Sequence, residues 1–550
     1  MVFLGLSRDW LSELHFAEHS PTWGQLQREF DMSSPDSNQQ SDGGAPQFQQ
    51  RLGLFDATML VAGSMIGSGI FLVSADIARD VGSTGWLMLV WLLTGVITII
   101  GALSYAELAA MMPHAGGQYV YLRESFGSLW GFLYGWTVFL VIQPGSIAAV
   151  AVAFAKYLGV LVPSLGTDQI LVRVSNINFA IKGTLPWMSE PLTFFERTEF
   201  TISSGQLVAV GVIVFLTWLN NLGVEHGRWI QNVFTIAKTI GLVMLIGLGL
   251  TVAVQPAVMT ANWSNLWGGI ETTPRFAAVQ KLTSVGPTLT AWMVIGAAMV
   301  GSLFSADAWN NVTFTAGETR NPRRNIPLSL VIGTVLVIGL YMLANVAYLA
   351  ALPIQGDAAG ATPLERGIAF AKDDRVATAV LEQVSPSLGV PAMAVAIMIS
   401  TFGCVNGMIL MGARLYYAMA KDGLFFKPCG ELNFRGVPTI GLLLQAAWAV
   451  ALVFSGTYGE LLDYVIFACL LFYALTVSGL FVLRKTRPDA ERPYRTWGYP
   501  IVPALYVLMC VAVMLDLLIV KPIYTWPGLL IVAAGVPVYF VWKRRSVAPA

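Results

Sequence analysis

The chain has 550 residues, of which 55% are hydrophobic and 12% are charged. A soluble domain carries about 25% charged residues, so this composition argues against a soluble protein and for a membrane protein. The formal net charge is zero, which gives no reason to expect a nucleic-acid partner.

Twelve apolar blocks are long enough to cross a bilayer as helices, which takes roughly 20 residues each. Eleven of them contain no charged residue: 57–75, 87–106, 129–155, 206–224, 282–306, 325–356, 386–413, 436–459, 464–483, 496–515 and 522–542. The other block, 229–254, contains one charge, Lys238. The blocks do not alternate as barrel strands would. The sequence therefore predicts an all-α polytopic membrane protein with twelve transmembrane helices.

Residues 1–50 are polar and rich in Ser, Gln, Asp and Gly, and we expect a disordered cytoplasmic tail there. An even number of spans puts both termini on one side of the membrane. The densest basic clusters fall on the side of the termini: Arg320, Arg323 and Arg324; Arg484, Lys485 and Arg487; Arg492 and Arg495; Lys543, Arg544 and Arg545. The positive-inside rule therefore predicts cytoplasmic termini. We expect a plasma (inner) membrane for a separate reason, the lack of cysteine in the stretch 161–205.

The first and sixth spans are interrupted. The first has Gly63, Gly67 and Gly69 within seven residues, and each glycine costs about 1 kcal/mol in a helix interior. The sixth contains a run of small and polar residues at 301–311, including Asp307. Breaks at matching places in two halves of five spans indicate the central site of a transporter. Glycines that only allow close helix packing are the alternative.

A broken helix exposes backbone groups that a continuous helix would use. We expect a half-helix to begin near Ser68 and Gly69 and to present its positive N-terminal end to a carboxylate. The carbonyls freed at Met65, Phe304 and Asp307 would suit an ammonium group. Such a site is complementary to the zwitterionic end of an α-amino acid.

Several motifs in this order resemble the amino acid–polyamine–organocation superfamily, and its L-type amino acid transporter branch in particular. Gly67-Ser68-Gly69-Ile70-Phe71 is similar to the substrate loop of the superfamily. The stretches similar to the L-type branch are 304–310, 318–322, 324–327, 401–407, 414–423 and 492–495. The resemblance runs from about Leu52 to the C-terminus.

The resemblance implies a five-plus-five inverted repeat (LeuT-like) with broken helices 1 and 6, which works by alternating access. The first repeat would be residues 51–256 and the second 257–485. Residues 486–550 would hold the last two helices and a cytoplasmic C-terminus.

The family also implies roles at the breaks. Ser68 and Gly69 would hold the substrate carboxylate, the carbonyls named above would hold its ammonium, and Phe304 would close as an aromatic gate. The candidate substrate-binding residues are Ser64, Met65, Gly67, Ser68, Gly69, Phe304, Ser305, Ala306, Asp307 and Trp309. Relatives often have an aromatic residue and a glycine where this chain has Ala306 and Asp307. The smaller Ala306 would enlarge the pocket, and Asp307 would favour a cationic substrate, carry a proton, or pair within the bundle.

Lys238 lies about nine residues into its span, roughly 14 Å along a helix. It could extend to the cytoplasmic surface. Alternatively its ammonium replaces the cation that sodium-coupled relatives hold beside the first break, as in similar family members that work without sodium. A proton-switch role is also open, because buried lysines shift their pKa readily.

Other residues carry fewer implications. We expect Glu107 to pair with a basic residue of a cytoplasmic loop and Asp516, near a predicted helix end, to need no special role. The histidines and cysteines have no metal-ligand spacing, so no cofactor or metal is expected. The sequence shows no nucleophile paired with a base, so we do not expect an enzyme. The resemblance to eukaryotic L-type transporters implies a partner glycoprotein linked through a cysteine in the loop after the third span. The stretch 161–205 lacks cysteine, so we expect no disulfide-linked heavy subunit.

The favoured function is a sodium-independent permease, either an exchanger or proton-linked, that moves neutral amino acids across the lipid bilayer. A transporter of cationic amino acids or polyamines is the alternative, because of Asp307. A non-transporting amino acid sensor on the same scaffold is the second alternative.

Overall fold

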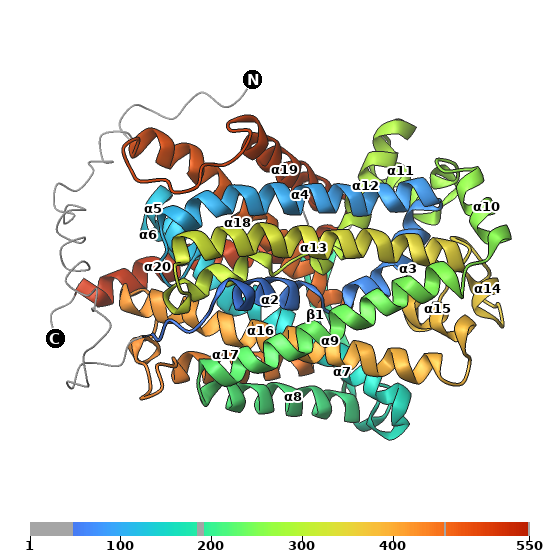
Figure 1. Ribbon diagram of the computed structural model, residues 1–550, viewed down its shortest axis with the longest axis horizontal. Helices are drawn as coiled ribbons and strands as arrows, with labels where there is room; N and C mark the ends of the chain where they lie inside the picture. Colours follow the sequence, from blue (N-terminus) through green and yellow to red (C-terminus); the bar gives the residue numbers. More distant parts are fainter. Residues whose placement is uncertain (1–47, 184–191, 456–457, 548–550) are drawn as a thin grey trace. The chain divides into compact units, whose positions relative to one another are not determined.

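The computed structural model describes residues 48–183, 192–455 and 458–547 (Figure 1). The predicted disordered tail therefore lies almost wholly outside the described residues. The longer helices are α2 Leu54–Met65, α3 Gly69–Val81, α4 Thr84–Met111, α7 Gln143–Leu161, α8 Ser204–Asn221, α9 Val224–Thr251, α12 Pro287–Ser305, α13 Pro322–Ala351, α16 Gly389–Lys421, α17 Thr439–Ser455, α18 Tyr458–Thr486, α19 Ile501–Val520 and α20 Pro522–Val547.

Shorter elements connect or extend these helices. They are α5 Gln118–Phe126, α6 Ser128–Thr137, α10 Pro256–Ser264, α11 Pro274–Thr283, α14 Pro363–Arg366, α15 Val376–Val384, the π-helix η2 Val138–Ile142, and the 3₁₀ helices η3 Pro163–Leu165, η4 Ile270–Thr272, η5 Trp309–Glu318, η6 Lys372–Asp374 and η7 Lys427–Gly430. The third span is thus α6, η2 and α7 in sequence.

Within the described residues, eleven helical segments are long and apolar enough to cross a membrane. The shorter apolar helix α17 occupies the place of the predicted span 436–459. The all-α polytopic architecture predicted from the sequence is confirmed.

Both predicted breaks are present. The first span divides into α2, which ends at Met65, and α3, which begins at Gly69. The sixth divides into α12, which ends at Ser305, and the 3₁₀ helix η5. Ala308 precedes η5 with a φ of 64°, a left-handed conformation that interrupts the helix and is uncommon for a residue other than glycine.

Helix packing brings the two breaks together. The helix α2 lies against α9, α13 and α16, while α4 packs on α13 and α7 on α16. A Cβ atom at Gly69 would lie 2.0 Å from Ser305 Oγ, so the first and sixth spans touch where both are broken. Only a residue without a side chain allows this approach.

A β-hairpin lies in the stretch 161–205, for which the sequence predicted no defined structure. The strands β1 Ile170–Gly183 and β2 Leu192–Ser203 pair antiparallel, with Ile170 opposite Ser203. The β-branched residues at 170–174 were the available signal.

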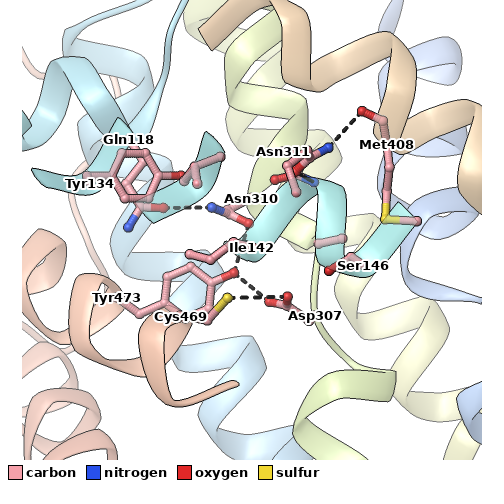
Figure 2. Close-up of a pocket in the computed structure, with 13 residues that line it drawn as sticks. Gln118, Tyr134, Ile142, Ser146, Asp307, Asn310, Asn311, Met408, Cys469 and Tyr473 are labelled. Carbon is pink, nitrogen blue, oxygen red and sulfur yellow. Dashed lines mark hydrogen bonds between the residues drawn. The ribbon is translucent and has the colours of Figure 1, made fainter. Parts of the chain in front are cut away.

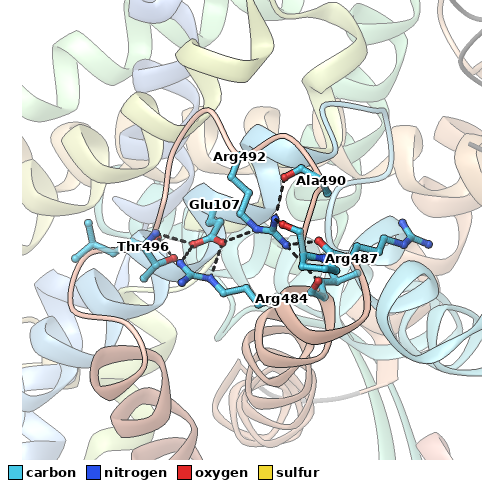
Figure 3. Close-up of polar contacts among 9 residues, drawn as sticks. Glu107, Arg484, Arg487, Ala490, Arg492 and Thr496 are labelled. Carbon is cyan, nitrogen blue, oxygen red and sulfur yellow. Dashed lines mark hydrogen bonds and ion pairs between the residues drawn. The ribbon is translucent and has the colours of Figure 1, made fainter. Parts of the chain in front are cut away.

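Arginines surround the carboxylate of Glu107 (Figure 3). Glu107 is fully buried and accepts hydrogen bonds from Arg484 Nη2 at 2.7 Å and from the backbone N–H of Thr496 at 2.6 Å. Arg492 Nε lies 3.4 Å from the same carboxylate. The expectation that Glu107 pairs with loop cations is confirmed, and the pairing joins α4 to α18 and to the segment before α19.

Glu124 lies on α5, between two spans. Burial raises the pKa of Glu124, but hydrogen bonds from Arg487 and Arg123 outweigh this effect, so the pKa lies below its usual value of 4.5. Arg487 Nη2 donates to Glu124 Oε2 at 2.8 Å.

Candidate functional site

A small cavity of about 20 Å³ lies between the two breaks. Eight of the ten candidate substrate-binding residues line it: Ser64, Met65, Gly67, Ser68, Gly69, Phe304, Ser305 and Asp307. Ser146 and Val150 of α7, Ala308 at the second break, and Cys404 and Met408 of α16 complete the wall. We call this space the central cavity. A space of this size holds about one water molecule.

The helix α3 presents its N-terminal end to the central cavity. Ser68 is its N-cap residue and Gly69 its first residue, and both line the cavity. The N–H groups of the first turn have no partner within a helix, and they carry the positive end of its dipole. This end of the cavity therefore suits a carboxylate.

Two of the backbone carbonyls that the sequence predicted to be free at the breaks already accept hydrogen bonds. Met65 O accepts hydrogen bonds from Tyr341 Oη at 2.9 Å and from the Gly67 N–H at 2.8 Å. Tyr341 Oη also lies 3.0 Å from Ser305 O, so this buried hydroxyl joins the two breaks. The Asp307 N–H donates to Phe304 O at 3.1 Å. An ammonium group that binds here would share or displace these contacts.

Lys238 does not extend to the membrane surface. Its side chain is buried, and its ammonium donates hydrogen bonds to Gly63 O, to Ile66 O at 2.8 Å and to Ser400 O at 3.2 Å. Two of these carbonyls belong to the first break and its last helical turn. The structure thus places the amino group of Lys238 beside the break, among three carbonyl oxygens, and not at the surface.

Asp307 lines three small cavities, and Figure 2 shows the residues around one of them. Its Oδ1 accepts a hydrogen bond from Tyr473 Oη at 2.5 Å, and Cys469 Sγ lies 3.6 Å from Oδ2. Both partners belong to α18. The carboxylate is therefore paired within the bundle and also borders the central cavity.

Asp307 also lines a second cavity of about 20 Å³. We call it the polar cavity, because the amide side chains of Gln118, Gln143, Asn310 and Asn311 are among the groups that line it. Asn310 Nδ2 donates to Gln118 Oε1 at 2.8 Å, and Gln143 Nε2 donates to Met408 O at 2.7 Å (Figure 2). Gln143 directly follows the π-helix η2, a feature that is frequent at functional sites. Sequence reasoning missed this cavity, although Gln143 is the lone amide side chain in the block 129–155.

Ala306 and Trp309 do not reach the central cavity. They line a third cavity of about 20 Å³ with Ile97, Leu303 and Tyr506. The left-handed Ala308 between them and the 3₁₀ geometry of η5 alter the side-chain directions that a regular helix would give. Trp309 packs edge-on against Tyr105, with ring centroids 4.8 Å apart. The expectation that these two residues bind substrate with the others is not supported by their positions.

A buried ion pair fastens the far end of η5 to α16. Arg414 Nη2 lies 2.9 Å from Glu318 Oε1, and Arg414 Nε lies 3.1 Å from Glu318 Oε2. The side chains are 1% and 2% exposed. The pair holds the sixth and eighth spans together on the side of the polar cavity. Among the described residues, no cluster of three or more His, Cys, Asp or Glu suits a metal ion.

Comparison with known proteins agrees with this geometry. A family model described as "Amino acid permease" matches residues 52–540. The b(0,+)-type amino acid transporter 1 of Mus musculus is 28% identical over 91% of this chain and 91% of its own length. The large neutral amino acids transporter small subunit 2 of Mus musculus is 30% identical over 93% of this chain and 85% of its own length. The human b(0,+)-type amino acid transporter 1 is 30% identical over 90% and 88%. The chain belongs to the amino acid permease family.

Proposed function

We propose that this permease moves neutral amino acids without sodium, by alternating access at the central cavity. The observation that carries the proposal is the meeting of two broken helices around one cavity. The amino end of α3 would hold the substrate carboxylate at Ser68 and Gly69. The carbonyls of Phe304 and Met65 would hold the ammonium once the contact with Tyr341 rearranges.

Sodium independence is supported by Lys238. Its ammonium already satisfies the carbonyls of Gly63, Ile66 and Ser400, which are the kind of oxygen ligand a monovalent cation takes. A sodium ion in the same cage would meet a buried positive charge at contact distance. We therefore propose that the lysine acts as a permanent cation at the first break.

A neutral substrate fits the wall of the central cavity. Val150 and Met408 are apolar, and Ser146 and Cys404 are small. The carboxylate of Asp307 is engaged by Tyr473, so it is not a free counter-ion for a charged side chain. The relatives include proteins named as transporters of large neutral amino acids.

Transport of cationic amino acids or polyamines is the second candidate, because Asp307 borders the central cavity. A substrate cation would have to replace the Tyr473 hydroxyl as the partner of Asp307. A non-transporting sensor would use the same cavity and is separated from both candidates by its lack of uptake.

Orientation and assembly complete the proposal. The basic clusters favour a plasma (inner) membrane with both termini cytoplasmic, which places the arginine cluster around Glu107 inside the cell and the β-hairpin outside. The division into repeats at 51–256 and 257–485, with 486–550 outside them, follows from the matching breaks. We also propose that the transporter has no disulfide-linked heavy subunit, because the stretch 161–205 lacks cysteine.

The test is a substrate panel in proteoliposomes. Uptake of labelled leucine, alanine, arginine and putrescine would be compared for the native chain and Asp307→Asn. We expect saturable uptake of a neutral amino acid by both proteins. Uptake of arginine or putrescine alone, lost in D307N, would favour the second candidate. Binding without uptake of any compound would favour the sensor.

A further inference from the structure

A larger cavity of about 330 Å³ lies away from the central cavity, between α4, α12 and α19. Its size is at the lower end of the range of small-molecule pockets. The wall is apolar and includes Leu93, Leu289, Trp292, Met299 and Met509. Leu289 and Trp292 are each about half exposed, so the cavity opens on the outer surface of the helix bundle, where lipid lies.

One carboxylate stands in this apolar wall. Asp516 lies on α19, four residues before the helix ends, or about 6 Å along the axis. Both of its carboxylate oxygens are shielded from solvent, and neither has a hydrogen-bond partner among the described residues. A Cβ atom at Gly296 would lie 2.3 Å from Asp516 Oδ2, so the carboxylate is packed against the α12 backbone.

The neighbouring cation does not satisfy this carboxylate. Arg275 on α11 is a nearby cation, but its Nε forms an ion pair with Asp80 Oδ1 at 3.3 Å and donates no hydrogen bond to Asp516. An acidic group within a membrane span is costly unless it is paired, and such groups mark functional sites. The position of Asp516 near a helix end, which suggested no role from the sequence, does not explain why its oxygens are buried without a partner.

We propose that this cavity binds an amphipathic amine dissolved in the bilayer. A single hydrocarbon chain would fill the apolar volume, and its terminal ammonium would pair with Asp516. A phospholipid with an ammonium headgroup fits less well, because its phosphate would need a cation and the nearby Arg275 is engaged by Asp80. In the orientation proposed above, the ligand enters from the outer leaflet.

The ligand would contact a helix that takes part in transport. Gly296 and Met299 lie on α12, which ends at Ser305 in the central cavity. A chain packed against this half-helix opposes any movement of α12 away from α19. We therefore expect the bound amine to slow transport without occupying the substrate site.

The test is photolabelling of the whole protein in lipid nanodiscs. The probe is octadecylamine with a mid-chain diazirine, and octadecanol with the same diazirine is the matched control. We expect the amine to label peptides of α12 or α19 at least tenfold more than the alcohol does. Asp516→Asn should reduce amine labelling to the level of the alcohol. Asp489→Asn, which removes an exposed carboxylate in the turn after α18, should not.

Equal labelling by amine and alcohol, or full amine labelling of D516N, would overturn the proposal. If D516N does not fold, competition in the native chain decides. Unlabelled octadecylamine should then displace the probe at least tenfold better than octadecanol, and equal displacement would overturn the proposal. These measurements do not depend on uptake, so they remain valid if the transport proposal fails.

Discussion

Replacing Lys238 by alanine removes the cation from the carbonyl cage at the first break. The ammonium donates three hydrogen bonds to Gly63 O, Ile66 O and Ser400 O. A hydrogen bond from a charged group contributes about 1.5–3 kcal/mol, and buried carbonyls left without a partner are destabilising. The K238A protein should therefore favour conformations in which the break refolds or takes up water.

The minimum effect on substrate affinity can be estimated from the loss of a single hydrogen bond. If only one of the three bonds is lost when the break rearranges, the competent conformation becomes about 10- to 150-fold rarer, at 1.4 kcal/mol per tenfold. The apparent affinity for substrate falls by the same factor, because a ligand that binds only one conformation has an apparent affinity proportional to the population of that conformation. Loss of all three hydrogen bonds would give a larger effect. That effect is reduced because burying alanine costs less desolvation free energy than burying the lysine ammonium.

The assay is uptake of a labelled neutral amino acid into proteoliposomes in sodium-free buffer. We expect K238A to need at least tenfold more substrate for half-maximal uptake and to regain part of the loss when sodium replaces choline. Lys156→Ala, which removes a partly exposed lysine of α7 away from the break, is the control and should behave as the native chain. K238A with an unchanged substrate dependence, in a protein of native thermal stability, would refute the reasoning.

Three further changes test other contacts. Gly69→Ala puts a Cβ 2.0 Å from Ser305 Oγ, and such overpacking costs about 1–3 kcal/mol. The substitution should weaken amino acid binding by at least fivefold in a scintillation proximity assay. Gly211→Ala is the control and should not weaken binding, because its Cβ would have nothing within 4 Å. Glu318→Gln leaves its arginine buried and unpaired at a cost of about 3–5 kcal/mol, and an unchanged thermal midpoint would contradict this. Glu124, with its pKa below 4.5, stabilises the folded chain above that pH and loses the effect as the pH falls through the lowered pKa. The difference in thermal midpoint between the native chain and Glu124→Gln should therefore shrink below pH 4.5, and a constant difference would contradict the ion pairing.

The breaks could be predicted from sequence because their signal is local. Gly63, Gly67 and Gly69 stand in an otherwise apolar block, and the small and polar residues of the sixth span do the same. Lys238 was visible for a similar reason, as one charge in a long apolar block. A single charged residue in a long apolar block is costly to bury, so its presence alone indicates a specific structural or functional role.

Contacts between distant spans could not be predicted in this way. Tyr341 reaches both breaks from α13, and Gln143 reaches the polar cavity from α7, but neither stands in a motif. Their side chains meet the site only because of how α13 and α7 are packed and rotated. Trp309 was assigned to the substrate site by its place in the motif, and the left-handed Ala308 places it in the neighbouring cavity.

Two other features were also missed in the sequence. The hairpin β1–β2 lies in a polar connection whose length alone indicated no structure. Asp516 looked like an ordinary residue near a helix end, and its significance depends on the cavity that α4 and α12 form around it. The hairpin had a local signal in its β-branched residues, whereas the cavity around Asp516 depends on segments far apart in the chain.

The most direct test of the central claim is counterflow in proteoliposomes that contain the purified protein and no sodium on either side. Liposomes loaded with unlabelled leucine should accumulate external labelled leucine transiently, and the accumulation should saturate. Liposomes without protein provide the background. Accumulation that requires sodium, or none above the protein-free background, would contradict a sodium-independent amino acid permease.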